Sequence, residues 1–308
     1  MTAVQSMRPS NTESFTRTVM IAKSAGFCFG VRRAVDIALA QRPTNADKTA
    51  SLGPIVHNPR VSADLKRSGI GEVTSLDALS SGDTVIMSAH GVSPQVLKDA
   101  GERGLNIVDV TCPFVTKLHR SAMMLAREGY QVLLVGDAGH TEVLGVVGAV
   151  ESIGGQILVI SCLEELEKIA LSKRVGVVSQ TTQYLHRLAE ITAAVCMRAS
   201  EVRSINTVCG ATEELQAAAM EMAQQVDVAI VIGGWKSANT RRLREICAAQ
   251  GIPAYQVESP EEIQESWLFG KRVVGLTAGA STPDSDIQEA ARILRGERVV
   301  QQPIIRSA

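Results

Sequence analysis

The chain has 308 residues, of which 45% are hydrophobic and 20% are charged, and its formal net charge at pH 7 is −1. This composition indicates a soluble protein with room for about two or three small domains, and the near-neutral charge excludes a general basic surface for nucleic acid. Aromatic residues make up 3% of the chain, too few for recognition of bases by stacking. No apolar run reaches the roughly 18 residues of a membrane-spanning helix. The sequence therefore predicts neither a nucleic-acid partner nor a membrane partner.

The two ends of the chain are predicted to lie outside the folded part. Residues 1–18 lack the apolar core of a secretory signal and are predicted to be a disordered lead-in, and residues 296–308 are predicted to be a C-terminal tail. The six cysteines are spread along the chain without the short spacings of a disulfide framework. Reduced thiols in the cytoplasm are therefore expected.

Three cysteines occupy the same predicted setting, a junction at which a strand ends and a helix begins. The first is Cys28, which follows the apolar stretch TVMIA and a glycine turn and precedes a helix with an apolar face. The second is Cys112, between the run 107–110, rich in β-branched residues, and Pro113, which suits the first turn of a helix. The third is Cys209, which also precedes a helical pattern. A helix N-terminus stabilises a thiolate, so each of these cysteines is a candidate nucleophile or metal ligand.

Two further series of junctions follow the cysteines at nearly constant spacing. Each junction again consists of a predicted strand, a polar turn and a helix. The residues of the second series are His57, His140 and Ser237. The residues of the third series are His90, Thr181 and Ser281. Each third of the chain is thus predicted to have the element order β-α-β-α-β-α.

This repetition predicts an α/β protein of three similar domains, each with a small, mostly parallel sheet between helices. The predicted domains are residues 19–111, 112–207 and 208–295. Ligands of open parallel sheets bind beyond the carboxyl ends of the strands, which is where all the junction residues lie. If the three domains face one another, these residues converge on one central cavity.

Three thiolates from three domains favour a soft metal centre. A structural zinc site normally has closely spaced ligand pairs and four ligands, and this chain lacks such pairs. Three cysteines could instead hold an iron–sulfur cluster and leave one iron open to substrate, since such clusters usually take four cysteine ligands. A zinc hydrolase with three thiolate ligands, and three isolated core cysteines, are the alternatives. Cys162, Cys196 and Cys247 lie outside the repeated junctions and are interpreted as core or incidental residues.

Polar side chains at the predicted helix starts are candidates for an anion site. They are His57, His90, Ser237, Asn239 and Ser281. Imidazole, hydroxyl and amide donors at helix N-termini favour phosphate or diphosphate as the ligand. No Walker glycine loop is present, so ATP is not the expected ligand.

Two residues near the predicted cavity admit both a catalytic and an ordinary structural interpretation. Glu142, two residues after His140, could be a proton donor if burial raises its pKa, or it could be an acidic residue favoured in a first helical turn. Thr181 could orient a substrate hydroxyl or cap a helix. The regular spacing of the junctions favours the first role for Thr181.

Several short motifs together are similar to those of one family. They are GFCFGVRRA, HNPRV, SAHGVS, TCPFVTKLH, GHTEV, SQTT, NTVCGAT and TAGASTPD. The chain resembles the 4-hydroxy-3-methylbut-2-enyl diphosphate reductase family over about residues 19 to 293. The resemblance implies three α/β domains in a pseudo-threefold trefoil around an oxygen-sensitive [4Fe–4S] cluster. It also implies removal of the substrate's allylic hydroxyl with two electrons and two protons, which gives isopentenyl and dimethylallyl diphosphates in the last step of the methylerythritol phosphate route to isoprenoids.

The resemblance implies roles for individual residues as well. The cluster ligands would be Cys28, Cys112 and Cys209. Glu142 would deliver the proton to the leaving hydroxyl, with Thr181 and His140 arranging the proton path and contacting the substrate. The diphosphate would be bound by His57, His90, Ser237, Asn239 and Ser281. The implied partners are a small-molecule allylic diphosphate and reduced ferredoxin or flavodoxin as the electron donor.

The third domain departs from the family's pattern at three positions. The family often has two serines before the asparagine, whereas this chain has Lys236 before Ser237 and Ala238 in place of the second serine; Leu215 stands where arginine is common. A backbone N–H or Lys236 could partly replace the lost hydroxyl. These departures leave open a paralogue that acts on another allylic or phenolic compound. A non-catalytic redox or iron sensor is the other alternative, in which Glu142 and the diphosphate donors would be superfluous.

Overall fold

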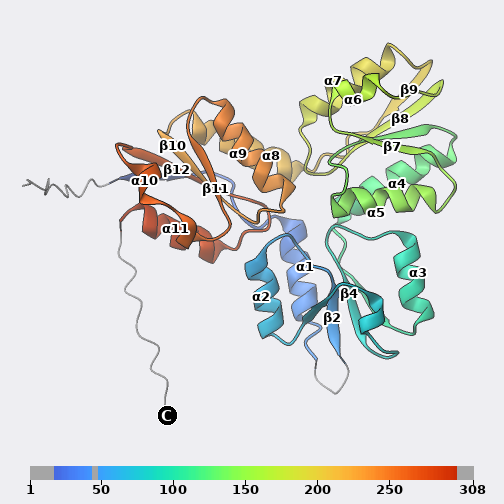
Figure 1. The fold of residues 1–308 in the computed structure, drawn as a ribbon, viewed down its shortest axis with the longest axis horizontal. Helices are drawn as coiled ribbons and strands as arrows, with labels where there is room; N and C mark the ends of the chain where they lie inside the picture. Colours follow the sequence, from blue (N-terminus) through green and yellow to red (C-terminus); the bar gives the residue numbers. More distant parts are fainter. Residues whose placement is uncertain (1–16, 44–47, 297–308) are drawn as a thin grey trace, which may run out of the picture.

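A computed structural model describes residues 17–43 and 48–296 of the chain. Figure 1 shows three lobes around a common centre, and each lobe contains one four-stranded sheet with its helices. Every strand pair within the three sheets is parallel. The α/β fold with three similar units, predicted from the repeated junctions, is confirmed. Most of the predicted lead-in and of the predicted C-terminal tail falls on residues 1–16 and 297–308, outside the described residues.

The first unit has the strand order β3-β2-β4-β5. Its strands are β2 (Thr49–Leu52), β3 (Gly71–Val73), β4 (Thr84–Met87) and β5 (Asn106–Asp109). Its helices are α1 (Phe29–Leu39), α2 (Pro59–Arg67) and α3 (Pro94–Glu102), with the short 3-10 helix η1 (Leu76–Ala78). A proline opens both α2 and α3, at a position where the missing N–H costs no helical hydrogen bond.

The second unit repeats this arrangement with the strand order β7-β6-β8-β9. Its strands are β6 (Gln131–Val135), β7 (Ile157–Ile160), β8 (Arg174–Ser179) and β9 (Glu201–Ser204). Its helices are α4 (Pro113–Arg127), α5 (Thr141–Glu151), α6 (Leu163–Glu167) and α7 (Leu185–Cys196). The two central strands of the sheet, β6 and β8, are almost wholly buried, because helices cover both faces of the sheet.

The third unit has the strand order β11-β10-β12-β1. Its strands are β1 (Thr18–Ile21), β10 (Val228–Ile232), β11 (Ala254–Val257) and β12 (Val273–Ala278). Its helices are α8 (Gly210–Ala223), α9 (Ala238–Ala249), α10 (Glu265–Leu268) and α11 (Asp284–Leu294), with the 3-10 helix η2 (Pro260–Glu262). The outer strand of each sheet, β3, β7 or β11, is an addition to the three strands per domain that the junction pattern predicts.

The strand before Cys28 lies in the third unit, although the predicted domain 19–111 includes it. β1 pairs with β12, with Thr18 opposite Val273 and Ile21 opposite Leu276. It takes the position in its sheet that β5 and β9 take in the other two sheets. The helices α1, α4 and α8 therefore each follow a strand of one unit and pack into the core of the next. The three units are joined as a closed ring by this crossover.

The core of each unit lies on both faces of its sheet. In β10, for example, Ala229 and Val231 face α8 and α9, whereas Ile230 and Ile232 face α11 on the other side. Because both faces are covered, every residue of β10 is buried and the strand is an unbroken apolar run. The end of such a strand is easily recognised in the sequence, because the apolar run stops there and the polar residues of the junction begin.

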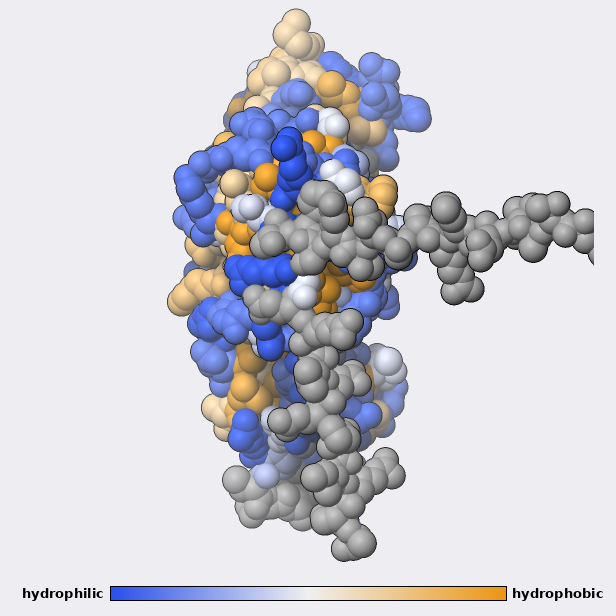
Figure 2. Space-filling view, turned by 90° about the vertical axis from the view of Figure 1, so that its left-hand side faces the viewer, coloured by the Kyte–Doolittle hydropathy of each residue, from blue (hydrophilic) through white to orange (hydrophobic). Residues whose placement is uncertain are grey.

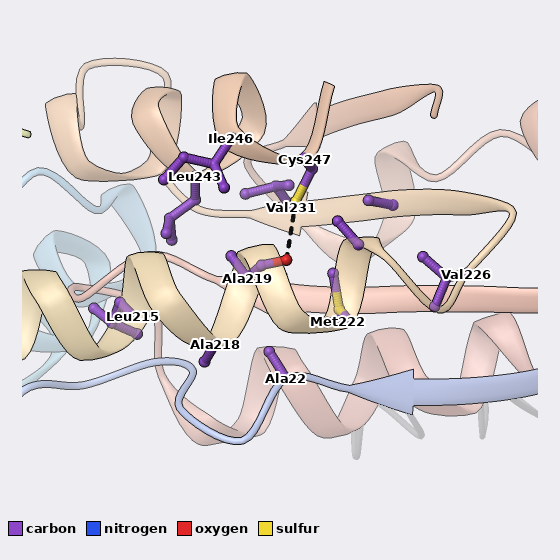
Figure 3. Close-up of a cluster of buried hydrophobic side chains, with 12 residues drawn as sticks. Ala22, Leu215, Ala218, Ala219, Met222, Val226, Val231, Leu243, Ile246 and Cys247 are labelled. Atoms are coloured by element: carbon purple, nitrogen blue, oxygen red, sulfur yellow. Dashed lines mark hydrogen bonds between the residues drawn. The ribbon is translucent and has the colours of Figure 1, made fainter. Parts of the chain in front are cut away.

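Figure 3 shows the cluster between α8, α9 and the sheet of the third unit. Leu215 is 2% exposed in this cluster and packs with the apolar side chains there. It is not among the residues that line the central cavity, so Leu215 contributes to the core of the unit and not to the cavity wall. The Cys247 thiol, also in this cluster, donates to the carbonyl of Ala219 over 3.9 Å, as expected for a core cysteine.

The outer surface of the third unit shows no separation into polar and apolar halves. Figure 2 presents this side of the molecule, on which hydrophilic and hydrophobic residues are intermingled. Of the helices in residues 17–43 and 48–296, none combines the length and the apolar character needed to cross a bilayer.

Candidate active site

All nine junction residues line one cavity, of about 100 Å³, between the three units. They are Cys28, His57, His90, Cys112, His140, Thr181, Cys209, Ser237 and Ser281. Glu142 and Asn239 line the same cavity. The residues meet because the carboxyl ends of the three parallel sheets are directed at a common centre.

Three thiols enter the cavity at helix N-termini. Cys28, Cys112 and Cys209 are the N-cap residues of α1, α4 and α8. Burial raises the pKa of the Cys112 and Cys209 thiols, and backbone amides at the helix starts act against this rise. The Cys28 sulfur accepts a hydrogen bond from the Val31 amide at 3.5 Å. A side chain at Gly30 would clash with the Cys112 sulfur and lie 3.9 Å from the Cys28 sulfur, so glycine keeps the space beside both thiols open.

The chemistry of these three thiols fits an iron–sulfur cluster. Each thiolate of such a cluster binds its own iron, so the donors can come from separate helices, as they do here. Among the side chains that the structure describes, no three His, Cys, Asp or Glu are arranged to hold a single metal ion. The other cysteines do not line the cavity: Cys247 is buried in α9, Cys196 is exposed at the end of α7, and Cys162 precedes α6.

Three histidine rings meet in the cavity. The rings of His57 and His90 stack with their centroids 4.1 Å apart, and His140 meets them edge-on at 5.2 and 5.7 Å. Burial is the largest cause that lowers the pKa of all three imidazoles, that of His140 to about 4. Lys236 lowers the pKa of His57 further, and the rings oppose protonation of one another. The rings are therefore neutral at pH 7, each with one N–H donor and one acceptor nitrogen.

The loops that carry two of these histidines are tied to other units. His140 caps α5, because its Nδ1 accepts a hydrogen bond from the Glu142 amide at 3.2 Å. His57, in the first unit, has its Nε2 3.2 Å from the hydroxyl of Thr141 in the second. The carbonyl of His57 accepts a hydrogen bond from the Ser281 hydroxyl of the third unit at 3.4 Å. The cavity wall is thus built across the boundaries between units.

Glu142 is a buried acid whose carboxyl group is held by Thr181. It is 2% exposed, and both of its carboxyl oxygens accept hydrogen bonds from Thr181, one from the backbone amide and one from the hydroxyl. Burial raises the pKa of Glu142, while the Thr181 hydrogen bonds act against the rise. The carboxyl is therefore closer to its proton-bearing form than an exposed glutamate, and its orientation is fixed.

The N-terminus of α9 presents polar groups to the cavity. Ser237 is its N-cap residue and accepts a hydrogen bond from the Thr240 amide at 3.3 Å. Asn239 is 3% exposed, and neither its amide nitrogen nor its amide oxygen has a hydrogen-bond partner among the described residues. A buried amide without a partner calls for a ligand, since desolvation of its polar atoms is otherwise uncompensated. Ala238 lines the cavity between them, whereas Lys236 is exposed and lines a neighbouring groove with His57.

Two residues that frame the site were not singled out from the sequence. Asp137, in the turn before His140, and Arg242, in α9, form an ion pair between the second and third units at 2.9 Å. The side chain of Arg242 is only 4% exposed. Its position in a charged, amphipathic helix gave no sequence signal of burial, because arginines at such positions are ordinarily solvated.

The amino-acid sequence of this chain is similar to those of several known proteins. The sequence model of the family described as "LytB protein" matches residues 19–295. A protein of Pelobacter propionicus named 4-hydroxy-3-methylbut-2-enyl diphosphate reductase is 43% identical over 272 residues, which are 88% of this chain and 95% of that protein. An enzyme of the same name from Aquifex aeolicus is 40% identical over 271 residues, which are 88% of this chain and 93% of that enzyme.

A solved structure shares the fold at a comparable identity. It is described as (E)-4-hydroxy-3-methyl-but-2-enyl diphosphate reductase, the terminal enzyme of the non-mevalonate pathway, and is 39% identical with a TM-score of 0.67 over 92% of this chain and all of that one.

Proposed function

Because this chain belongs to the LytB protein family, we propose that it is an iron–sulfur oxidoreductase acting on 4-hydroxy-3-methylbut-2-enyl diphosphate. It would remove the allylic hydroxyl as water, with two electrons and two protons, to give isopentenyl and dimethylallyl diphosphates. The observation that supports the proposal is the meeting of three thiols, a buried acid and the polar N-terminus of α9 in one cavity.

Cys28, Cys112 and Cys209 would hold a [4Fe–4S] cluster through their thiolates. When bound, the cluster would supply the electrons and leave one iron without a protein ligand. The helix N-termini at which the thiols lie favour the deprotonated form that a metal requires. The space kept open by Gly30 lies beside two of these thiols.

The diphosphate would bind where the helix starts and the neutral histidines offer donors. Ser237 and Asn239 lie in the first turn of α9, where backbone amides and the helix dipole favour negative charge. His57 and His90 would each donate one ring N–H, and Ser281 its hydroxyl. This arrangement would fix one end of the substrate and direct the other toward the thiols and Glu142.

Glu142 would supply the proton that makes the leaving hydroxyl into water. Burial raises its pKa and so favours the form that carries a proton, and Thr181 sets the direction of its oxygens. His140 would support this arrangement, since its ring nitrogen holds the amide of Glu142 at the start of α5. The electrons would come from reduced ferredoxin or flavodoxin in the cytoplasm.

The second candidate function is that of a paralogue acting on a different substrate, and one observation favours it. Ala238 lines the cavity at the place where the family often has a serine, so one potential donor to the diphosphate is absent. Leu215 does not support this alternative, because it packs in the core of the third unit. A different allylic or phenolic compound would fit a cavity with one donor fewer.

Anaerobic purification followed by iron and sulfide analysis tests the cluster and separates it from a zinc site. Turnover of the allylic diphosphate by the loaded protein, with a low-potential electron donor, tests the enzyme. Iron and sulfide together with both isopentenyl products support the proposal. A loaded cluster without turnover favours the sensor or the paralogue, and turnover of another allylic alcohol decides for the paralogue.

A further inference from the structure

Arg242 of α9 reaches from the third unit into the second. Its Nε donates to the side-chain oxygen of Gln183 at 3.2 Å, and one terminal nitrogen donates to the Thr182 hydroxyl at 3.3 Å. Its other terminal nitrogen donates to both carboxylate oxygens of Asp137 at 2.9 and 3.0 Å. All three guanidinium nitrogens of this buried side chain are thus used on two loops of the second unit.

One of the two loops leads into the helix of the proposed proton donor, Glu142, and the other contains its partner. The first is the turn from Asp137 to His140, whose backbone is closed by a hydrogen bond from the His140 amide to the Asp137 carbonyl at 3.1 Å. The second contains Thr181, which binds both oxygens of Glu142. The two loops also touch each other, because the Asp137 amide donates to the side chain of Gln180 at 3.0 Å.

The proposed anion-binding residues lie on the same helix, one turn before Arg242. Ser237 and Asn239 open α9, and Arg242 follows within the next turn of the helix. A guanidinium is suited to this use because it stays charged and its five N–H groups can serve a carboxylate and further acceptors at the same time. Arg242 therefore connects the anion site to the loops of the acid through one rigid element.

We propose that Arg242 is a positioning residue that fixes the Glu142–Thr181 pair relative to the anion site of α9. The inference rests on the proposed function, because it concerns the geometry of that reaction. Arg242 is not among the described residues that line the cavity, so it acts through the loops and not on the substrate. Displacement of a reacting group by about 1 Å can lower the rate about 100-fold, which sets the scale of the expected effect.

The chain offers a matched control in the neighbouring arginine. Arg241 also binds Asp137, at 2.6 Å, but its side chain is 43% exposed and it has no hydrogen bond to the loop of Thr181 within the described residues. Arg241→Lys therefore changes a cation on the same carboxylate without touching that loop. It should leave the turnover number within about twofold of the wild type, as is usual for an exposed ion pair.

The test uses the holoenzyme and compares Arg242→Lys, which keeps the charge, with the wild type. The turnover number should fall by about 10- to 100-fold while the Michaelis constant and the iron content stay within about threefold. In a Glu142→Gln background, Arg242→Lys should cause little further loss, because the residue that it positions is already disabled. A merely structural arginine would instead give independent, multiplicative losses in the double variant.

A second variant keeps the inference testable if Arg242→Lys does not fold. Asp137→Asn preserves the shape of the turn and removes one charge of the pair, and it should show the same loss of turnover and the same non-additivity with Glu142→Gln. Normal turnover in either folded variant, or additive losses, overturns the inference while the proposed function stands. Absence of turnover in the wild type overturns the proposed function and the inference with it.

Discussion

Thr181 donates its backbone N–H and its hydroxyl to the two oxygens of the Glu142 carboxyl group, over 2.6 and 2.7 Å. Both donors come from one residue at the end of β8, so the orientation of the carboxyl group is set by a neighbouring loop and not by its own helix. A buried acid held through both oxygens has a fixed orientation in the cavity wall. This relationship makes Glu142 the most informative position to change.

Glu142→Gln should separate chemistry from binding. The amide can still accept the Thr181 N–H, so the fold, the cluster and the affinity for diphosphate should remain. Turnover should fall by about 10² to 10⁴, the usual contribution of a positioned general acid. Steady-state kinetics with iron analysis measures this, and Glu151→Gln at the exposed end of the same helix is the control. If turnover is unchanged, the proton comes from His140 or water; if iron is lost, Glu142 has a structural role.

Replacement of each cysteine by serine should divide the six residues into two groups. Cys28→Ser, Cys112→Ser and Cys209→Ser should each lose the cluster and the activity, because a hydroxyl is a poor ligand for iron compared with a thiolate. The variants at the positions outside the cavity, which are Cys162, Cys196 and Cys247, should keep both. Iron content and the visible absorption of anaerobically prepared protein measure this. Full iron content in Cys112→Ser would show that Cys112 is not a ligand of the cluster.

Ser237→Ala should weaken substrate binding more than it slows turnover. A hydrogen bond to a charged partner contributes about 1.5–3 kcal/mol, so the Michaelis constant should rise about 10- to 100-fold. The hydroxyl also caps α9, and its loss should lower the free energy of unfolding by about 1 kcal/mol. Ser237→Thr restores the hydroxyl and should reverse both effects. An unchanged Michaelis constant would show that Ser237 is only a helix cap.

Asn239→Asp tests whether the amide of Asn239, which has no hydrogen-bond partner in the part of the chain that the structure describes, faces an anion. The side chains have the same shape, but the carboxylate would repel a diphosphate, and a like charge in contact costs several kcal/mol. The dissociation constant of inorganic diphosphate, measured by calorimetry on the holoenzyme, should therefore rise at least about 100-fold. Asn106→Asp on the exposed strand β5 makes the same change of charge away from the cavity and should leave binding unaltered. Normal binding by Asn239→Asp would move the anion site elsewhere.

His140→Asn should make the protein less sensitive to acid. Burial, with the neighbouring His57, lowers the pKa of His140 to about 4 from an ordinary value of 6.5, so the unfolded chain takes up a proton that the folded protein does not. The stability from the neutral ring is present above pH 6.5 and is lost as the pH falls toward 4. Between pH 7.5 and pH 5 this loss is about 2 kcal/mol for one such residue.

Urea denaturation at the two pH values measures the difference for His140→Asn. Asparagine is a good N-cap and should keep the start of α5 intact, so the variant should lose about 2 kcal/mol less than the wild type on acidification. His186→Asn, at an exposed position of α7, is the control. Equal acid sensitivity of the wild type and His140→Asn would mean that His140 is not held neutral by its surroundings.

The repeated strand-to-helix junctions made most of the fold and of the cavity predictable. Residues such as His90 and Thr181 lie at the ends of buried parallel strands, and the apolar run before them marks where each strand ends. The placement of β1 could not be predicted in this way, because its sheet is determined by pairing with β12, which is distant in sequence. The burial of Arg242 was equally hidden, since its partners Asp137 and Gln183 are distant in sequence.

The pairing of β1 with β12 also sets an order of events during synthesis. Thr18, near the start of the chain, lies opposite Val273, which leaves the ribosome only when most of the protein has been made. The first and second sheets can form from strands that emerge close together, and domains of nascent chains generally fold from the N-terminus onward. The third sheet must wait for β12, because long loops close slowly and late contacts limit the rate. β1 therefore joins its sheet late, and in a ribosome-stalled chain that lacks β12 it is without the strand with which it pairs.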